Sequence, residues 1–331
     1  MAIDLGGTNL RTALADRAGR ISYGKQENTP LGKQGIIDLM ICQIDRAARL
    51  AELEGLKVIG VGVSTGGRVD FKTGTVVDAT SLILDWKDVH IKNAIIEQSF
   101  NLPTAVDNDG NCSAIAEKVF GKAKFVDNFI SIALGTGIGE GIFVDGKILR
   151  GENNYAAEVG HVTVKADGPK CSRGSCGCVE LYASGSRLVR WAKEEYPSLA
   201  EVVTGCESSA KIIADFAHSG NAAALDLLNR AGIMLGAAAA GWVNIPNPSM
   251  ILLLGSLMGL GNPYFNGFRK AVMERAIRPT ADFLRIEFSD FQSEAGTKGR
   301  QHSRSVIYRR KQPIIETPYC PTFMNERTEH E

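Results

Sequence analysis

Three apolar segments of the chain each run into a glycine-rich turn, and this repeated pattern restricts the fold more than any other feature of the sequence. The turns are Asp4-Leu-Gly-Gly-Thr-Asn9, Leu134-Gly-Thr-Gly-Ile-Gly139 and Leu254-Gly-Ser256. Glycine tolerates positive φ angles and lets backbone N–H groups approach a phosphate closely. Any one of them could be a plain hairpin turn, but three at strand ends favour a nucleotide-binding cleft between two lobes.

The first turn also carries polar side chains that suit a nucleotide. The hydroxyl of Thr8 can donate a hydrogen bond to a phosphate oxygen. Asp4 can hold Mg²⁺ through water, because this ion prefers carboxylates and keeps several of its own waters.

Strand-like and helix-like segments alternate along the chain, which is typical of an α/β fold. Hydrophobic spacing predicts helices over 34–54, 91–99, 111–120, 209–218 and 222–242. Short apolar runs predict strands over 10–15, 20–23, 57–63, 129–134 and 250–254, whereas 64–68 is too rich in glycine to be regular. The length of 331 residues predicts two domains. We expect a small N-terminal α/β lobe over 1–107, a larger α/β lobe over 108–292, and a divergent, poorly ordered tail over 293–331.

The composition excludes several classes of protein. Lys and Arg number 37 and Asp and Glu number 37, so the formal net charge is zero, and hydrophobic residues make up 44%. This balance excludes a disordered chain and gives no reason to expect a nucleic acid as partner. The longest apolar stretch, 231–243, is shorter than the ~18 residues of a membrane span, and the N-terminus shows no signal-peptide pattern. We therefore expect a cytoplasmic protein with no membrane association.

Two carboxylates stand where a predicted strand meets a predicted helix, in Val106-Asp-Asn-Asp-Gly-Asn-Cys112. One of them could cap the helix while the other stays solvated, which is the purely structural interpretation. Alternatively, Asp107 or Asp109 could accept a proton from a substrate hydroxyl, which is what phosphoryl transfer requires of its base.

Three of the seven cysteines cluster in Cys171-Ser-Arg-Gly-Ser-Cys176-Gly-Cys178, and His161 precedes them. The odd number and the clustering favour reduced thiols and a metal site over a disulfide framework. One imidazole and three thiolates can hold Zn²⁺ tetrahedrally with no open position, which marks a structural site. Glu158 and Glu180 bracket this cluster, where they could bind sugar hydroxyls or be ordinary surface charges.

These motifs together resemble sugar kinases of the ROK family, in the actin/hexokinase-like (ribonuclease H-like) superfamily. The resemblance covers about residues 2–290. Within the family, the stretches 62–69, 106–112, 156–161 and 176–185 are most similar to the N-acetylmannosamine kinase domain of bifunctional UDP-N-acetylglucosamine 2-epimerase/N-acetylmannosamine kinases. The resemblance implies a two-lobed fold and ATP-dependent phosphorylation of the 6-hydroxyl of an N-acetylhexosamine, as in sialic acid biosynthesis. We also expect a homodimer or higher homo-oligomer.

The resemblance also implies roles for individual residues. Asp109 would be the catalytic base. The sugar would be contacted by Gly67, Arg68, Thr80, Asn108, Glu158, His161 and Glu180. ATP and Mg²⁺ would be bound by Asp4, Gly6, Gly7, Thr8, Asn9, Gly135, Thr136, Gly137 and Gly255. Structural zinc would be held by His161, Cys171, Cys176 and Cys178.

Three positions depart from the family pattern, and they keep other functions open. Arg173 stands where the family has its second zinc cysteine, so Cys176 would have to substitute for it. Glu140 stands where a glycine usually follows the second turn, and 293–300 replaces a closing apolar helix. The alternatives are a glucokinase or N-acetylglucosamine kinase of the same family, and a catalytically impaired sugar-binding homologue. A sugar-responsive repressor is a further alternative, but it would need a helix-turn-helix segment ahead of Asp4.

Overall fold

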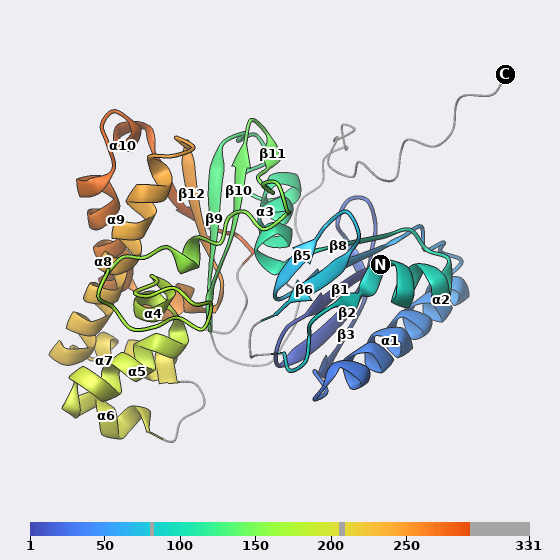
Figure 1. Cartoon of the computed structure of the whole chain (residues 1–331), viewed down its shortest axis with the longest axis horizontal. Helices are drawn as coiled ribbons and strands as arrows, with labels where there is room; N and C mark the ends of the chain where they lie inside the picture. Colours follow the sequence, from blue (N-terminus) through green and yellow to red (C-terminus); the bar gives the residue numbers. More distant parts are fainter. Residues whose placement is uncertain (80–82, 205–208, 292–331) are drawn as a thin grey trace. The chain divides into compact units, whose positions relative to one another are not determined.

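The computed structural model describes residues 1–79, 83–204 and 209–291, which form two compact units (Figure 1). The described part of the first unit is 1–109, and that of the second is 110–291. Thr80 and the predicted tail over 293–331 lie outside the described residues. Each unit contains a mixed sheet with helices, which confirms the predicted α/β class.

The first unit is built on a five-stranded sheet in the order β3-β2-β1-β4-β8. Its strands are β1 (Ala2–Leu5), β2 (Asn9–Ala15), β3 (Ile21–Asn28), β4 (Val61–Thr65) and β8 (Thr104–Asn108). β1 is antiparallel to β2, whereas β1, β4 and β8 run parallel. The carboxyl ends of these three strands therefore meet at one edge of the sheet.

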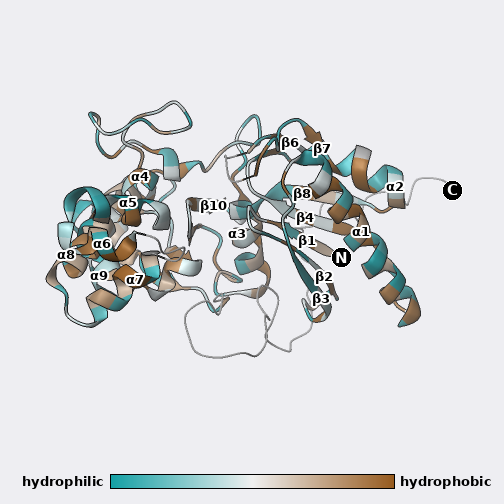
Figure 2. Cartoon of the chain, turned by 90° about the horizontal axis from the view of Figure 1, so that it is seen from below, coloured by the Kyte–Doolittle hydropathy of each residue, from teal (hydrophilic) through white to brown (hydrophobic). Residues whose placement is uncertain are grey.

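Helix α1 (Lys33–Leu53) covers this sheet, close to the predicted range of 34–54. Its residues Ile36, Met40 and Ile44 recur with helical spacing and are fully buried against apolar residues of the sheet. Figure 2 shows the result as alternating brown and teal along the α1 ribbon. A π-helical segment (Ile91–Glu97) and α2 (Gln98–Phe100) follow, where the sequence predicted one helix over 91–99.

The segment 64–68 is more regular than expected. β4 continues to Thr65, and β5 (Arg68–Asp70) begins directly after the turn. β5 pairs with β6 (Thr75–Asp78), and β6 also pairs with β7 (Val89–His90). Gly67 makes this tight connection possible because its φ is +107° and a Cβ there would lie 2.9 Å from Ala79. The prediction of an irregular loop was therefore wrong except at Gly66 and Gly67.

The second unit contains another five-stranded sheet, in the order β11-β10-β9-β12-β13. Its strands are β9 (Phe129–Leu134), β10 (Ile138–Val144), β11 (Lys147–Ile148), β12 (Met250–Leu254) and β13 (Arg285–Phe288). β9 and β12 match the predicted strands and run parallel, so the glycine-rich turns that follow them are neighbours.

The helices of the second unit that follow the first strands of its sheet pack into one large apolar core with that sheet. They are α4 (Glu180–Ala183), α5 (Gly185–Glu195), α6 (Pro197–Val203), α7 (Ser209–His218), α8 (Ala222–Val243), α9 (Asn262–Arg275) and α10 (Thr280–Phe283), with short 3-10 helices over Val159–His161 and Ser256–Leu260. Helix α3 (Asp109–Phe120) instead lies against β10, where a Cβ on Gly110 would be 2.6 Å from the backbone nitrogen of Glu140. α8 and α9 lie side by side (Figure 1) because Gly236 brings the backbones together, and a Cβ there would be 2.7 Å from Ala271.

Helix α8 is longer and more apolar than the sequence analysis expected of any segment of this chain. By length and hydropathy it could span a bilayer, although the sequence analysis predicted that no stretch would. In the second unit its residues Leu227, Leu228, Leu235 and Val243 are fully buried in the protein core. Packing between helices therefore accounts for its apolar character.

Candidate functional site

The carboxyl edge of the first-unit sheet gathers the predicted polar residues of that unit. Asp4 lies opposite Ser64 in the β1–β4 ladder, and Ser64 lies opposite Asp107 in the β4–β8 ladder. The Ser64 hydroxyl donates to Asp4 Oδ1 at 3.2 Å, and Arg11 Nη1 donates to Asp4 Oδ2 at 3.2 Å. The Asp4 carboxylate stays 44% exposed, so its oxygens remain accessible to the waters of a hydrated Mg²⁺.

The first glycine-rich turn is held by its carbonyl groups. Gly6 donates its N–H to the carbonyl of Asn9 at 2.9 Å, while Thr29 donates to the carbonyls of both Thr8 and Gly6. The N–H groups of Gly7 and Thr8 have no acceptor among the described residues. A turn whose carbonyls are tied down and whose amides are exposed is suited to bind an anion.

The turn after β4 brings together several predicted sugar residues. The Asn108 side chain donates to the carbonyl of Gly67 at 2.8 Å. Arg68 forms a two-point ion pair with Asp78, its neighbour across the β5–β6 ladder, with Nε 2.8 Å from Oδ1. The sequence analysis did not identify Asp78, because only strand pairing reveals this partner.

Asp107 and Asp109 lie in different environments at the β8–α3 junction. Asp107 is 5% exposed, and its Oδ1 accepts the backbone N–H of Asn108 at 2.9 Å. Asp109 is exposed in the first turn of α3, where the helix dipole stabilises a negative charge. Of the two, Asp109 is the carboxylate that a substrate can reach.

The second glycine-rich turn has the same construction as the first. Gly135 donates to the carbonyl of Gly137 at 3.0 Å, and the carbonyls of Gly135 and Thr136 accept hydrogen bonds from Gly185 N–H and the Ser186 hydroxyl. Within the described part of the chain, the N–H groups of Thr136 and Gly137 have no acceptor. Both predicted phosphate turns therefore expose backbone donors.

At Gly255, the third turn lies very close to the backbone at the start of the second turn. The φ of Gly255 is +102°, and a Cβ there would lie 2.8 Å from the backbone nitrogen of Leu134. A Cβ on Gly135 would in turn lie 3.6 Å from the Ser256 hydroxyl. Because strands β9 and β12 run parallel, the two turns that follow them lie close together.

Three of the four predicted zinc ligands lie together. The ligand atoms of His161, Cys171 and Cys178 all lie within 4.8 Å of one another, and His161 Nδ1 is 3.3 Å from Cys171 Sγ. A tetrahedral zinc ion with ordinary N and S bond lengths would separate such a pair by about 3.5 Å, so the group fits zinc. Burial, with a further contribution from the hydrogen bond to the Cys171 thiol, raises the pKa of Cys178 to about 11.

Cys176 is not part of this group, contrary to the expected substitution for Arg173. Its backbone forms an isolated bridge with Lys170, and its carbonyl accepts the Thr163 hydroxyl at 2.9 Å. The next residue, Gly177, turns the chain with a φ of +62° before Cys178 enters the group. The backbone pairing therefore separates the two neighbouring cysteines.

The three acidic residues near this cluster point to different partners. Glu158 Oε2 lies 3.8 Å from His161 Nε2, whereas Glu180 Oε2 accepts the N–H of Ile138 at 3.0 Å. Glu140 is 7% exposed, and its Oε1 would be 3.1 Å from a Cβ on Gly160. Its side chain therefore reaches the segment beside His161.

Some residues that shape these sites were missed from sequence. Trp86 is 1% exposed, and its indole N–H donates to the Thr65 hydroxyl at 3.0 Å. Ser186 holds the second turn, as described above. A single Trp between predicted elements and a Ser in the first turn of a helix carry no distinctive sequence signal.

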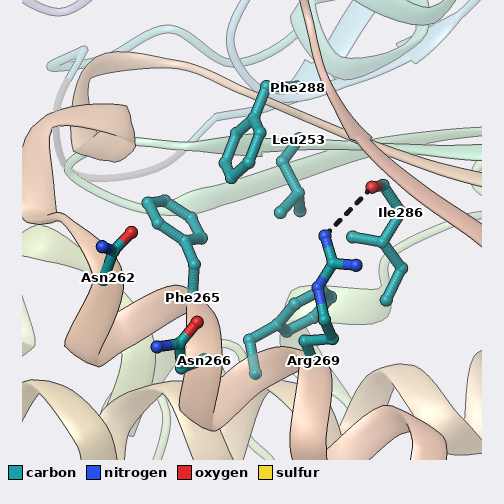
Figure 3. Close-up of a pocket in the computed structure, with 8 residues that line it drawn as sticks. Leu253, Asn262, Phe265, Asn266, Arg269, Ile286 and Phe288 are labelled. Carbon is teal, nitrogen blue, oxygen red and sulfur yellow. Dashed lines mark hydrogen bonds between the residues drawn. The ribbon is translucent and has the colours of Figure 1, made fainter.

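A separate cavity of about 200 Å³ lies between α9 and the strands β12 and β13 (Figure 3). Phe265 and Phe288 pack edge to face at its side, and Arg269 Nη2 donates to the carbonyl of Ile286 at 3.4 Å. None of the predicted site residues lines this cavity.

Known proteins are similar to the chain over most of its length. The model of the ROK family matches residues 1–302. A glucokinase of Streptomyces coelicolor is 31% identical over 303 residues, which are 88% of this chain and 93% of the glucokinase. A xylose repressor of Caldicellulosiruptor bescii is 28% identical over 317 residues, 90% of this chain and 76% of the repressor.

A solved structure gives the same relationship in three dimensions. The ROK family glucokinase from Streptomyces griseus, in complex with glucose and AMPPNP, has a TM-score of 0.74 and 33% identity. The match covers 89% of this chain and 95% of that glucokinase. Both described units lie within the range that the family model matches.

Proposed function

Since the chain belongs to the ROK family and has its two-domain actin/hexokinase-like fold, we propose that it is an ATP-dependent sugar kinase acting on the 6-hydroxyl of a hexose or hexosamine. The observation that carries this proposal is the exposed carboxylate of Asp109 at the β8–α3 junction, in a chain that also has two turns with exposed backbone amides. A base for the hydroxyl proton and donors for phosphate oxygens are the parts that phosphoryl transfer needs.

In this mechanism, residues of the chain position the sugar and ATP and remove the proton of the sugar hydroxyl. Asp109 takes the proton of the sugar hydroxyl as that oxygen attacks the γ-phosphorus of ATP, and the bond from this phosphorus to the β,γ-bridging oxygen breaks to release ADP. The amides of Thr136 and Gly137 bind phosphate oxygens in the second unit, and those of Gly7 and Thr8 do so in the first. Asp4 would hold Mg²⁺ through water, and the ion, when bound, would neutralise charge on the phosphates.

We propose N-acetylmannosamine as the first candidate substrate, on the strength of the local motifs around Arg68, Asp109 and His161. Glucose is the second candidate, and the identity of about 31–33% with two glucokinases favours it. The two sugars differ at carbon 2, where one carries an axial acetamido group and the other an equatorial hydroxyl. The proposed sugar contacts among the described residues are Gly67, Arg68, Asn108, Glu158, His161 and Glu180, with Arg68 oriented by its ion pair with Asp78.

A coupled assay of ADP release across glucose, mannose, N-acetylglucosamine and N-acetylmannosamine tests the function. We expect N-acetylmannosamine to give the highest kcat/KM, and a highest value for N-acetylglucosamine would leave only the N-acetylhexosamine class of substrate. A highest value for glucose would replace the first candidate by the second. Sugar binding without turnover on any of the four would instead support a repressor-like or impaired sugar-binding role, which the similarity to xylose repressors makes the competing function.

Zinc is proposed as a structural cofactor held by His161, Cys171 and Cys178. Ligation through His161 Nδ1 would leave Nε2 protonated, and that nitrogen already faces Glu158. These residues would fill three of the four positions of a tetrahedral structural site, and Cys171 Sγ also accepts the backbone N–H of Arg173 at 3.5 Å.

We expect the purified protein to contain about one zinc ion per chain, and Cys178→Ser to release it. A loss of about 2 kcal/mol would lower the midpoint of thermal unfolding by roughly 4–8 °C. The matched control is Cys176→Ser, which should keep its zinc because Cys176 lies outside the ligand group. Metal analysis after dialysis and differential scanning calorimetry measure both effects. Equal zinc loss in the two variants would contradict this ligand set.

Two further proposals concern the setting of the protein. Cytoplasmic location agrees with thiols kept reduced for a metal and with the supply of ATP there. A homodimer or higher homo-oligomer stays a prediction, which light scattering of the purified protein can check.

A further inference from the structure

The carboxylate of Glu180 contacts the second glycine-rich turn directly. Its Oε2 accepts a hydrogen bond from the N–H of Ile138, where the turn leads into β10, at 3.0 Å. Gly137 leaves room for this contact, since a Cβ there would lie 2.7 Å from the same oxygen. The residue proposed to bind the sugar therefore also contacts the turn proposed to bind the nucleotide phosphates.

The segment that begins with Glu180 holds the turn at further points. Gly185 donates its N–H to the carbonyl of Gly135 at 2.8 Å, and the Ser186 hydroxyl donates to the carbonyl of Thr136 at 2.9 Å. Glu180 and these two residues belong to the consecutive helices α4 and α5. Together they hold the turn at Gly135, Thr136 and Ile138, and the amides of Thr136 and Gly137 are left for a ligand.

Glu180 is itself placed by the cysteine cluster. Cys178 lies two residues earlier and is fully buried, and Val179 between them donates its N–H to the carbonyl of Val162 at 3.0 Å. Val162 directly follows His161. The loop that carries the proposed zinc ligands therefore determines where the Glu180 carboxylate enters the turn.

We propose that Glu180 is a positioning residue for the nucleotide as well as a sugar contact, so that its carboxylate couples the two binding sites. This inference rests on the proposed kinase function. A carboxylate has two oxygens, so Oε1 can accept a sugar hydroxyl while Oε2 holds Ile138. A bound sugar then fixes the carboxylate and, through it, the turn. By linkage, the nucleotide and the sugar each raise the affinity of the other by the same factor.

The first test measures AMPPNP affinity by calorimetry in the absence of sugar. Glu180→Ala should weaken it about tenfold, as expected when one hydrogen bond to a charged group is lost. Glu194→Ala is the matched control, because that carboxylate of α5 pairs with Arg190 and does not contact the turn, and the nucleotide affinity of this variant should stay within twofold of wild type. Glu180→Gln should restore most of the nucleotide affinity, since its amide oxygen can still accept from Ile138, but not the sugar affinity. Wild-type nucleotide affinity in Glu180→Ala would overturn the proposal.

A double-mutant cycle tests the coupling from the opposite side. Gly137→Ala should displace the Glu180 carboxylate and weaken sugar binding several-fold, although Gly137 is not a proposed sugar contact. In the Glu180→Ala background the same change should have no effect on sugar affinity, because the displaced group is gone. Additive effects of the two substitutions would contradict the coupling.

Amide hydrogen exchange separates this inference from the kinase function. Without any ligand, the segment 134–144 should exchange faster in Glu180→Ala than in wild type or Glu194→Ala, because Ile138 loses its acceptor. If the wild type binds no nucleotide and faster exchange is still seen, the kinase function fails while the Glu180 contact stands. Unchanged exchange in a wild type that does bind AMPPNP would refute the positioning role alone.

Discussion

Replacing Asp109 by asparagine is expected to lower the turnover number by about 10²–10⁴-fold, the usual contribution of a general base. Asparagine keeps the shape of the side chain and its place in the first turn of α3, but it cannot accept the proton of the sugar hydroxyl. The affinity for the sugar should therefore change little. Steady-state kinetics with the best sugar of the panel measures the effect as a fall in kcat.

Asp107→Asn is the matched control for this experiment. Asp107 is 5% exposed and accepts the backbone N–H of Asn108, so its loss should mainly reduce stability. We expect a lower midpoint of thermal unfolding, with turnover of the folded protein within about tenfold of wild type. Near-normal turnover in Asp109→Asn, with a collapse in Asp107→Asn, would transfer the role of base to Asp107.

Gly110→Ala is expected to destabilise the protein by about 3 kcal/mol, at the upper end of the usual cost of overpacking. A Cβ at this position would lie 2.6 Å from the backbone nitrogen and 2.9 Å from the carbonyl carbon of Glu140. Both are backbone atoms of the paired strand β10, so neither can move aside cheaply. Because Gly110 directly follows Asp109, the helix start should shift with it, and turnover should fall as well.

Gly241→Ala provides the matched control, since Gly241 is also a helical glycine but a Cβ there would have no atom within 4 Å. That variant should be more stable than wild type by roughly 0.5–1 kcal/mol, the difference in helix propensity between the two residues. Urea denaturation of both variants compares the two free energies of unfolding. A destabilisation by Gly110→Ala no larger than about 1 kcal/mol would show that the close approach of α3 to β10 is not required.

The elements that could be predicted from sequence are those with strong local patterns. The apolar spacing of 34–54 gave a helix within one residue of α1, and 129–134 and 250–254 correspond to β9 and β12. Helix α7 agrees with the predicted 209–218, and α8 extends one residue beyond its predicted end. In each case burial of one continuous apolar set favours the same local conformation that the residues prefer, so local and tertiary preferences agree.

The sequence by itself determined the chemistry of the site: glycine-rich turns at strand ends, carboxylates at a strand–helix junction, and a His and Cys cluster with metal-ligand spacing. Only the tertiary structure decided which of these groups are brought together. It separated Cys176 from Cys178, although they are two residues apart, because the backbone of Cys176 pairs with Lys170 and Gly177 turns the chain. It joined Glu180 to Ile138, which lies 42 residues away. Contacts of this kind depend on strand pairing and packing between distant segments, and no local pattern of residues encodes them.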